Sequence, residues 1–142
     1  MSSVFTRIIA GELPGRFVWR DDHVVAFLSI NPVTTGHVLV VPVEEVDHWV
    51  DLDPTLWAQV AAASHTVGRA ITAAFDAPRV GQMVAGFEVP HVHVHVFPAY
   101  GLDDIGFANA DPSPDPAALD DAATRIRSAL RAQGHGDAVP DA

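Results

Sequence analysis

The chain has 142 residues and a formal net charge of −10, with eight arginines, no lysine and no cysteine. This length corresponds to one domain with a substantial core, and the absence of cysteine excludes disulfides, thiolate catalysis and sulfur-ligated zinc. The negative charge argues against a nucleic-acid partner, which needs clustered cationic side chains. No apolar run reaches the roughly 20 residues of a membrane span, and no signal peptide is evident. We therefore expect a cytoplasmic protein without a membrane partner.

The first half of the chain is predicted to form a short helix and three strands. Ser3 is positioned to cap a helix that Gly11 and Pro14 would end. Residues 17–20 and 23–29 have the pattern of a hairpin around two aspartates. The run HVLVVP, residues 37–42, is almost fully apolar, which favours a central strand.

The second half is predicted to form a long helix, two strands and a last helix. Asp53 is an N-cap candidate, with Pro54 at the first helical position of a helix that extends to Phe75. Residues 80–86 and 91–98 are predicted strands. An acidic loop leads to an amphipathic helix over residues 115–134, and the residues beyond it are expected to fray. Because helices and strands do not alternate, an α+β domain with an antiparallel sheet is expected.

The segment HVHVHVFP places His91, His93 and His95 at alternating positions. In a strand these side chains share one face, about 7 Å apart, and the valines between them form a core face on the other side. Three interpretations are open. The histidines could form a polar outer face, or His91, His93 and His37 could bind zinc. A neutral imidazole could also attack phosphorus while its neighbours move protons.

Two glycines indicate where a pocket would form. Gly36 precedes His37 at the start of the predicted central strand, and Gly86 and Pro90 interrupt the backbone before the histidine run. A tight turn at Gly86 would expose backbone N–H groups to an anion. These features favour a pocket that combines one nucleophile with a phosphate-binding turn.

Residues 3–98 resemble the histidine triad (HIT) family of nucleotide hydrolases and transferases. HVHVHVF fits the family signature, in which three histidines alternate with apolar residues, and the elements IIAGE-P, -DD--AF--I-P and GH-LV-P precede it in order. The resemblance implies a HIT-like fold with a five-stranded antiparallel sheet, packed helices and a C-terminal helix, usually in a homodimer. It places a HIT domain at residues 1–100 and an acidic loop plus helix, packed on the same domain, at residues 101–142.

The resemblance also implies an activity and a set of site residues. His93 would attack the α-phosphorus of a purine nucleotide conjugate, such as a phosphoramidate or a dinucleoside polyphosphate, and form a nucleotidyl-histidine. His91 and His95 would assist phosphate binding and proton movement, and His37 would lie behind them. No cofactor is implied. The nucleotide-binding positions would be Ile8, Leu13, Phe27, Ser29, Ile30, Glu88 and Val89.

The sequence departs from the family pattern at several of these positions. Ser3, Thr6 and Glu45 stand where many relatives have two cysteines and a histidine that bind zinc, so no structural metal is expected. Ser29 replaces a ribose-binding aspartate, and the Glu88 carboxylate would lie beside phosphate, which costs Coulomb energy. Two alternatives therefore stay open: a nucleotide-binding module with little catalysis, and a zinc enzyme that uses His91, His93 and His37.

Overall fold

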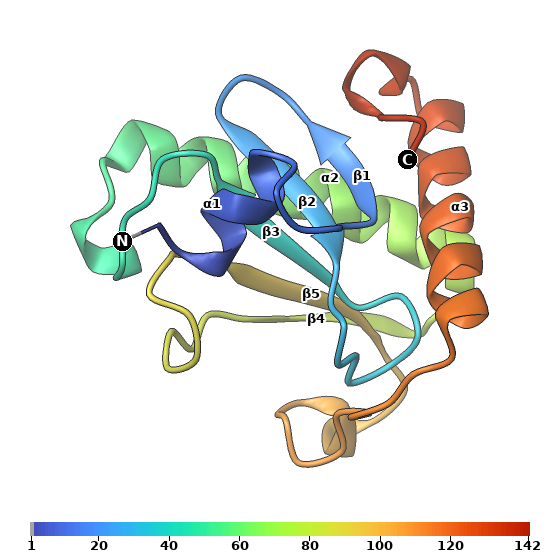
Figure 1. Cartoon of the computed structure of the whole chain (residues 1–142). Coiled ribbons are helices and arrows are strands. Elements are labelled where there is room, and N and C mark those ends of the chain that lie inside the picture. The colour runs from blue at the N-terminus through green and yellow to red at the C-terminus, as the bar shows by residue number, and fades with distance from the viewer. Residues whose placement is uncertain (1) are drawn as a thin grey trace.

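The computed structural model describes residues 2–142 and contains one five-stranded antiparallel sheet (Figure 1). The strand order is β1-β2-β3-β5-β4, so β3 lies in the middle, as its apolar sequence predicted. The α+β class and the HIT-like arrangement of sheet and C-terminal helix are confirmed. The strands are β1 Phe17–Arg20, β2 Val24–Leu28, β3 Val38–Pro42, β4 Arg79–Met83 and β5 Val94–Ala99.

Three helices begin at side-chain caps. They are α1 Val4–Ile9, α2 Pro54–Phe75 and α3 Pro116–Ala132. The Ser3 hydroxyl accepts the Thr6 N–H, and the carboxylates of Asp53 and Asp115 accept N–H groups of the first turns of α2 and α3. Each cap satisfies a donor that the helix itself leaves free. This local chemistry explains why the helix starts were predictable.

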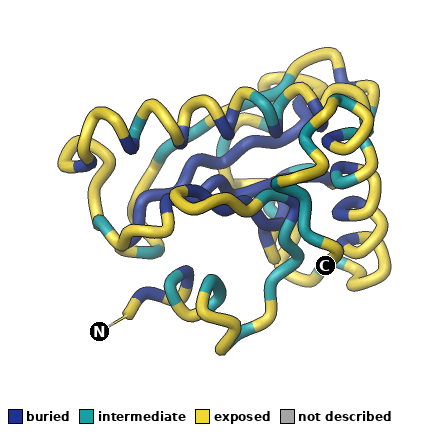
Figure 2. The backbone as a smooth tube through the Cα atoms, turned by 90° about the horizontal axis from the view of Figure 1, so that it is seen from above, coloured by how far each residue is buried: buried dark blue, intermediate teal, exposed yellow. Residues whose placement is uncertain are grey.

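The sheet separates the helices into two layers. Figure 2 shows the buried strands between α2 on one side and α1 on the other. Val92, Val94 and Val96 belong to the larger core, together with apolar residues of α2 and α3. Phe5 of α1 packs with Phe27 of β2 and other residues on the opposite face. The valines of the histidine run therefore face the main core, and the opposite face is left for the histidines.

Strand β5 begins at Val94 and not at His91, so the predicted strand over residues 91–98 was wrong at its start. The last β3 residue, Pro42, has no N–H to donate, and ladder pairing with β3 ends at Val94. The amide of Val92 instead donates to the carbonyl of Val46. His91 and His93 consequently lie in an irregular segment that turns away from the ladder.

The C-terminal residues are ordered against the domain, which corrects the expectation that they fray. His135 stacks edge-on against Trp19, with ring centroids 5.7 Å apart. Val139 packs against the main core, and the Arg131 guanidinium donates to the Pro140 carbonyl over 3.2 Å. These contacts fix a segment whose own sequence has little helix or strand preference.

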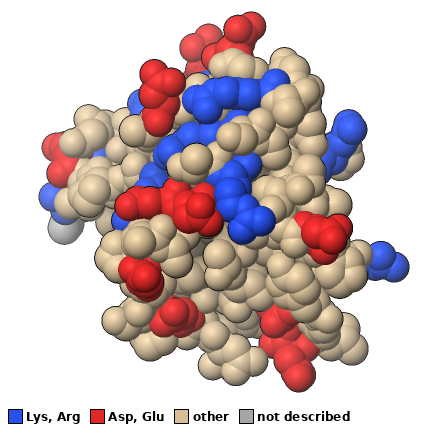
Figure 3. All heavy atoms as spheres, turned by 90° about the vertical axis from the view of Figure 1, so that its right-hand side faces the viewer, with Lys and Arg blue, Asp and Glu red and all other residues tan. Residues whose placement is uncertain are grey.

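Arginine side chains gather on the face that carries α3, with carboxylates directly beside them (Figure 3). The ion pairs here are Arg16–Asp120 at 2.7 Å, Arg131–Asp141 at 3.6 Å and Arg125–Asp121 at 4.0 Å. These arginines are thus paired locally. Among residues 2–142 no helix is both long enough and apolar enough to cross a bilayer.

Candidate active site

A cavity of about 770 Å³ opens on the face of the sheet that carries α1. Its walls come from α1, from β2 and β3, from the turn before the histidines, and from the segment between β5 and α3. This volume lies in the range of small-molecule sites. Its lining includes Phe5, Ile8, Phe27, Ser29, Ile30, Leu39, Glu88, Val89, His93, His95 and Phe107.

His93 has one ring nitrogen fixed and the other free for chemistry. Its Nδ1 lies 2.7 Å from the carbonyl oxygen of His91, which can only accept a hydrogen bond. Nδ1 therefore carries the proton, and the lone pair of the neutral ring is on Nε2. The ring lies against Phe5, with centroids 4.9 Å apart, and the side chain lines the cavity. This tautomer is the one that a nitrogen nucleophile requires.

His37 and His95 form a buried hydrogen bond with a defined direction. The Val33 N–H donates to His37 Nδ1 over 3.1 Å, so the proton of a neutral His37 is on Nε2. His37 Nε2 lies 3.0 Å from His95 Nδ1 and donates to it. The proton of His95 is then on Nε2. The cavity thus has the N–H donor of His95 beside the unprotonated Nε2 of His93, and the centroids of the two rings are 4.9 Å apart.

His91 lies behind His93 and does not line the cavity. Its Nε2 donates to the Pro42 carbonyl over 2.8 Å, and its Nδ1 accepts from the Ser3 hydroxyl over 2.7 Å. The side chain is fully buried. Both ring nitrogens are therefore used inside the protein, and the expected contact between His91 and phosphate is not available in this arrangement.

Burial keeps the four histidines neutral near pH 7. Burial and the neighbouring His95 and His93 lower the pKa of His37 from 6.5 to about 3. Burial and His93 lower the pKa of His95 to about 4. Burial also lowers the pKa values of His93 and His91, although their hydrogen-bonded carbonyls oppose the shift. In the neutral form, His93 has an unprotonated ring nitrogen and His95 has an N–H donor.

The charges around the cavity give little direct attraction for an anion. Glu88 lines the cavity, and its carboxylate is one of the groups that partly oppose the lowering of the His93 pKa by burial. The lining cation, Arg16, is bound to Asp120 at 2.7 Å. Gly86 has a φ of +82°, and within residues 2–142 no protein acceptor is found for the backbone amides of residues 87–89. These amides, and not side-chain cations, are the available anion donors.

The cavity brings together most of the predicted nucleotide positions. Ile8, Phe27, Ser29, Ile30, Glu88 and Val89 line it together with His37, His93 and His95. Leu13 is half-buried outside it. Sequence reasoning missed Phe107, whose ring lies 4.8 Å from that of His95, and also Arg16 and Asp120. The sequence feature that could have indicated Phe107 as a cavity residue is that it is an aromatic residue within an acidic loop.

Comparison with known proteins identifies the family. The sequence model of the HIT domain matches residues 10–102. Protein hit of Bacillus subtilis is 36% identical over 71% of this chain and 73% of its own length. A hypothetical histidine triad nucleotide-binding protein from Sulfolobus tokodaii is similar in structure, with a TM-score of 0.81, 26% identity and coverage of 90% and 91% of the two chains. The chain belongs to the HIT family, whose members include nucleotide-binding hydrolases and transferases.

Two further relatives bear on chemistry. A zinc-bound histidine triad protein from Mycobacterium smegmatis has a TM-score of 0.80 and 27% identity, with 96% of this chain and 98% of that chain covered. An asymmetrical bis(5′-nucleosyl)-tetraphosphatase from Schizosaccharomyces pombe is 35% identical over 55% of this chain and 46% of its own length. The first relative is bound to zinc, which raises the question of whether the residues of this chain could hold a zinc ion. The second is named for a dinucleoside polyphosphate substrate.

The residues of this chain do not fit a zinc ion. His91 has no free nitrogen, and Ser3 and Thr6 offer neutral hydroxyls where zinc prefers thiolate or imidazole. In the described part of the chain no three His, Asp or Glu side chains are grouped so that they could hold a metal. Both ring nitrogens of His91 and of His37 make hydrogen bonds within the protein, so of these three histidines only His93 has a free nitrogen, and the three together do not fit the proposed zinc site.

Proposed function

We propose that this protein cleaves a purine nucleoside monophosphate from a phosphoramidate, a dinucleoside polyphosphate or a similar conjugate. The observation that carries the proposal is the tautomer of His93. Its Nδ1–H is held by the His91 carbonyl, which leaves Nε2 unprotonated in a cavity large enough for a nucleotide. The S. pombe tetraphosphatase, a partial relative, supports a substrate of this class.

The proposed reaction has two displacements at the α-phosphorus. The Nε2 lone pair of His93 attacks phosphorus, and the bond to the leaving group breaks with its electron pair on that group. Water then attacks the nucleotidyl-histidine, the P–N bond breaks, and the electron pair returns to Nε2. The proton that water releases balances the proton taken up by an amine leaving group. The His95 Nε2–H is suited to stabilise the charge on phosphate oxygens throughout.

The base and ribose would occupy the apolar part of the cavity. Ile8, Phe27, Leu39 and Phe5 offer carbon surfaces for a purine ring, and Ser29 offers a hydroxyl to the ribose. The Ser29 hydroxyl already accepts the Asn31 N–H over 3.2 Å, so its proton is available to a ribose oxygen. The phosphate would then lie between His93 and the amides of residues 87–89.

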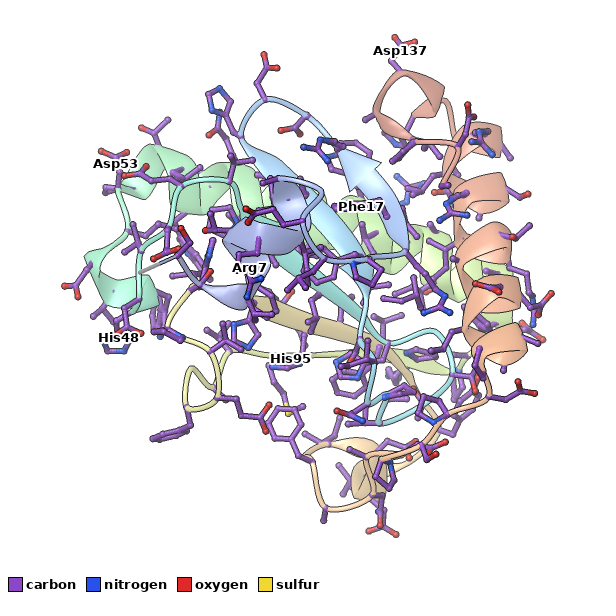
Figure 4. The ribbon with its side chains drawn as sticks, viewed as in Figure 1. Arg7, Phe17, His48, Asp53, His95 and Asp137 are labelled. Atoms are coloured by element: carbon purple, nitrogen blue, oxygen red, sulfur yellow. The ribbon has the colours of Figure 1, made fainter. Side chains whose placement is uncertain are left out.

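The decisive experiment replaces the proposed nucleophile. We expect His93→Ala to lower release of AMP or GMP from nucleoside phosphoramidates and dinucleoside polyphosphates by more than roughly a thousandfold, with the melting temperature changed little. The matched control is His48→Ala, because His48 is exposed, does not line the cavity and lies at the left edge of the view in Figure 4, whereas His95 lies near the centre. Full turnover by His93→Ala would refute the mechanism.

A second candidate function is nucleotide binding with little turnover. It is favoured by Glu88, an acidic residue that lines the cavity and whose negative charge partly opposes the lowering of the His93 pKa by burial. Isothermal titration with AMP separates the two candidates. Binding of AMP without turnover of any conjugate in a broad panel would favour the binding module, whereas turnover that depends on His93 would favour the enzyme.

We also propose a homodimer. Strand β4 is an edge of the sheet, with β5 on one side and, among residues 2–142, no strand on the other. Next to it, a second cavity of about 370 Å³ between α2 and β4 is lined by Gly68, Val80 and Val96 among others. An unpaired edge beside a hollowed surface is suited to pairing with a second copy. Light scattering at micromolar concentration should give twice the chain mass, and a monomer would contradict the proposal.

A further inference from the structure

Four side chains behind the nucleophile form one hydrogen-bonded cluster, which we call the polar clasp: Ser3, Thr6, Glu45 and His91. The Glu45 carboxylate accepts the Ser3 N–H over 2.7 Å and the Thr6 hydroxyl over 2.6 Å. The Ser3 hydroxyl lies 2.7 Å from His91 Nδ1 and also accepts the Thr6 N–H over 3.0 Å. The clasp joins the first turn of α1, the segment after β3 and the histidine run.

The proton positions in the clasp follow from its partners. Pro42 offers only a carbonyl, so His91 Nε2 must carry the proton and Nδ1 must accept. The Ser3 hydroxyl hydrogen therefore points to His91. The Ser3 amide and the Thr6 hydroxyl lower the pKa of Glu45, so its carboxylate is the ionised acceptor of both hydrogen bonds near pH 7. Every polar atom of the buried His91 ring is satisfied by protein groups.

We propose that the polar clasp is a metal-independent device that positions His93 for catalysis. The link is the His91 backbone, whose carbonyl accepts from His93 Nδ1 over 2.7 Å. The Val92 N–H, in the same peptide plane as that carbonyl, donates to Val46, and Ser3 and Pro42 hold the ring of the same His91 residue. Together these contacts fix the His91 carbonyl and hold His93 in the reactive tautomer. Ser3, Thr6 and Glu45 are thus positioning residues, because none of them lines the cavity. This inference rests on the proposed function of His93.

The kinetic test uses paired variants of the clasp. We expect Thr6→Val and Glu45→Ala, which each remove hydrogen bonds of the clasp, to lower kcat roughly tenfold or more, since small displacements of a nucleophile are costly, while KM and the affinity for AMP stay within about twofold. Thr6→Ser keeps the hydroxyl and should retain kcat. Glu44→Ala is the matched control, because Glu44 is exposed and has no described hydrogen bond within residues 2–142. Unchanged kcat in Thr6→Val and Glu45→Ala, or a rise in KM alone, would overturn the proposal.

A spectroscopic test does not depend on turnover. In ¹⁵N-histidine NMR spectra we expect His93 to be the Nδ1–H tautomer in the wild type and a mixture of tautomers in Thr6→Val. A single unchanged tautomer in that variant would contradict the clasp even if the enzyme has another substrate. Loss of turnover in His93→Ala tests the function separately, so the two proposals can fail independently.

A separate measurement tests whether the clasp works without a metal. Wild-type protein dialysed against a chelator should keep its kcat and its melting temperature and contain far less than one zinc per chain by elemental analysis. Stoichiometric zinc whose removal lowers both quantities would overturn the metal-independent clasp.

Discussion

At the residue scale, the site is defined by which nitrogen of each histidine carries a proton. Carbonyl oxygens accept from His93 and His91, and a backbone amide donates to His37. A backbone carbonyl can only accept a hydrogen bond and a backbone N–H can only donate one. The fold therefore sets the tautomer of each neutral histidine. As a result, the unprotonated Nε2 of His93 and the Nε2–H donor of His95 lie on neighbouring rings in the cavity.

Glu88 is the residue whose charge acts against the proposed substrate. Replacing it with glutamine removes one negative charge from the cavity while it preserves size. We expect Glu88→Gln to lower the Kd of AMP and the KM of a phosphoramidate by roughly threefold to tenfold at low salt, an effect that salt should weaken. Calorimetry and steady-state kinetics at two ionic strengths measure this. An unchanged Kd would mean that the carboxylate turns away when a nucleotide binds.

At the element scale, α3 depends on its N-cap although it lies late in the chain. The Asp115 carboxylate accepts the Ala117 N–H over 3.0 Å, and Ile126 and Leu130 of the helix are fully buried. We expect Asp115→Ala to lower the free energy of unfolding by about 1 kcal/mol, measured by urea denaturation. Asp121→Ala, on the exposed side of the same helix, is the control and should change stability by less than about 0.5 kcal/mol.

At the scale of the whole molecule, the buried histidines make stability depend on pH. The folded-state pKa values of His37 and His95 are about 3 and about 4, whereas the ordinary value is 6.5. Between these limits the unfolded chain binds more protons than the folded protein, so stability falls as pH decreases below about 6.5. Above that pH these two groups contribute a constant amount.

We therefore expect the free energy of unfolding to decrease between pH 7 and pH 5, by up to about 1.4 kcal/mol per pH unit for each such histidine. Urea denaturation at several pH values measures the slope. The variant His37→Gln, which cannot bind a proton, should have a shallower slope than the wild type. Equal stability of the wild type at pH 5 and pH 7 would show that the histidines are not buried in the neutral form.

Much of the fold could be predicted because its causes are local. Asp53 with Pro54, and Asp115 with Gly134, define the two long helices within a few residues of each boundary. The apolar run at residues 37–42 predicted the middle strand. The start of β5 was misplaced because it depends on the end of β3, which is far away in the sequence.

The sequence by itself determined the family motif, the helix caps and the apolar central strand, since each depends on residues close together in the chain. The choice of His93 as nucleophile follows from the resemblance to the family and stays a prediction. The tertiary structure decided the rest. It placed His91 behind His93, paired His37 with His95, placed Phe107 in the cavity wall and joined Ser3 to His91 across 88 positions. Such contacts depend on how distant segments pack, and no local pattern of side chains encodes that packing.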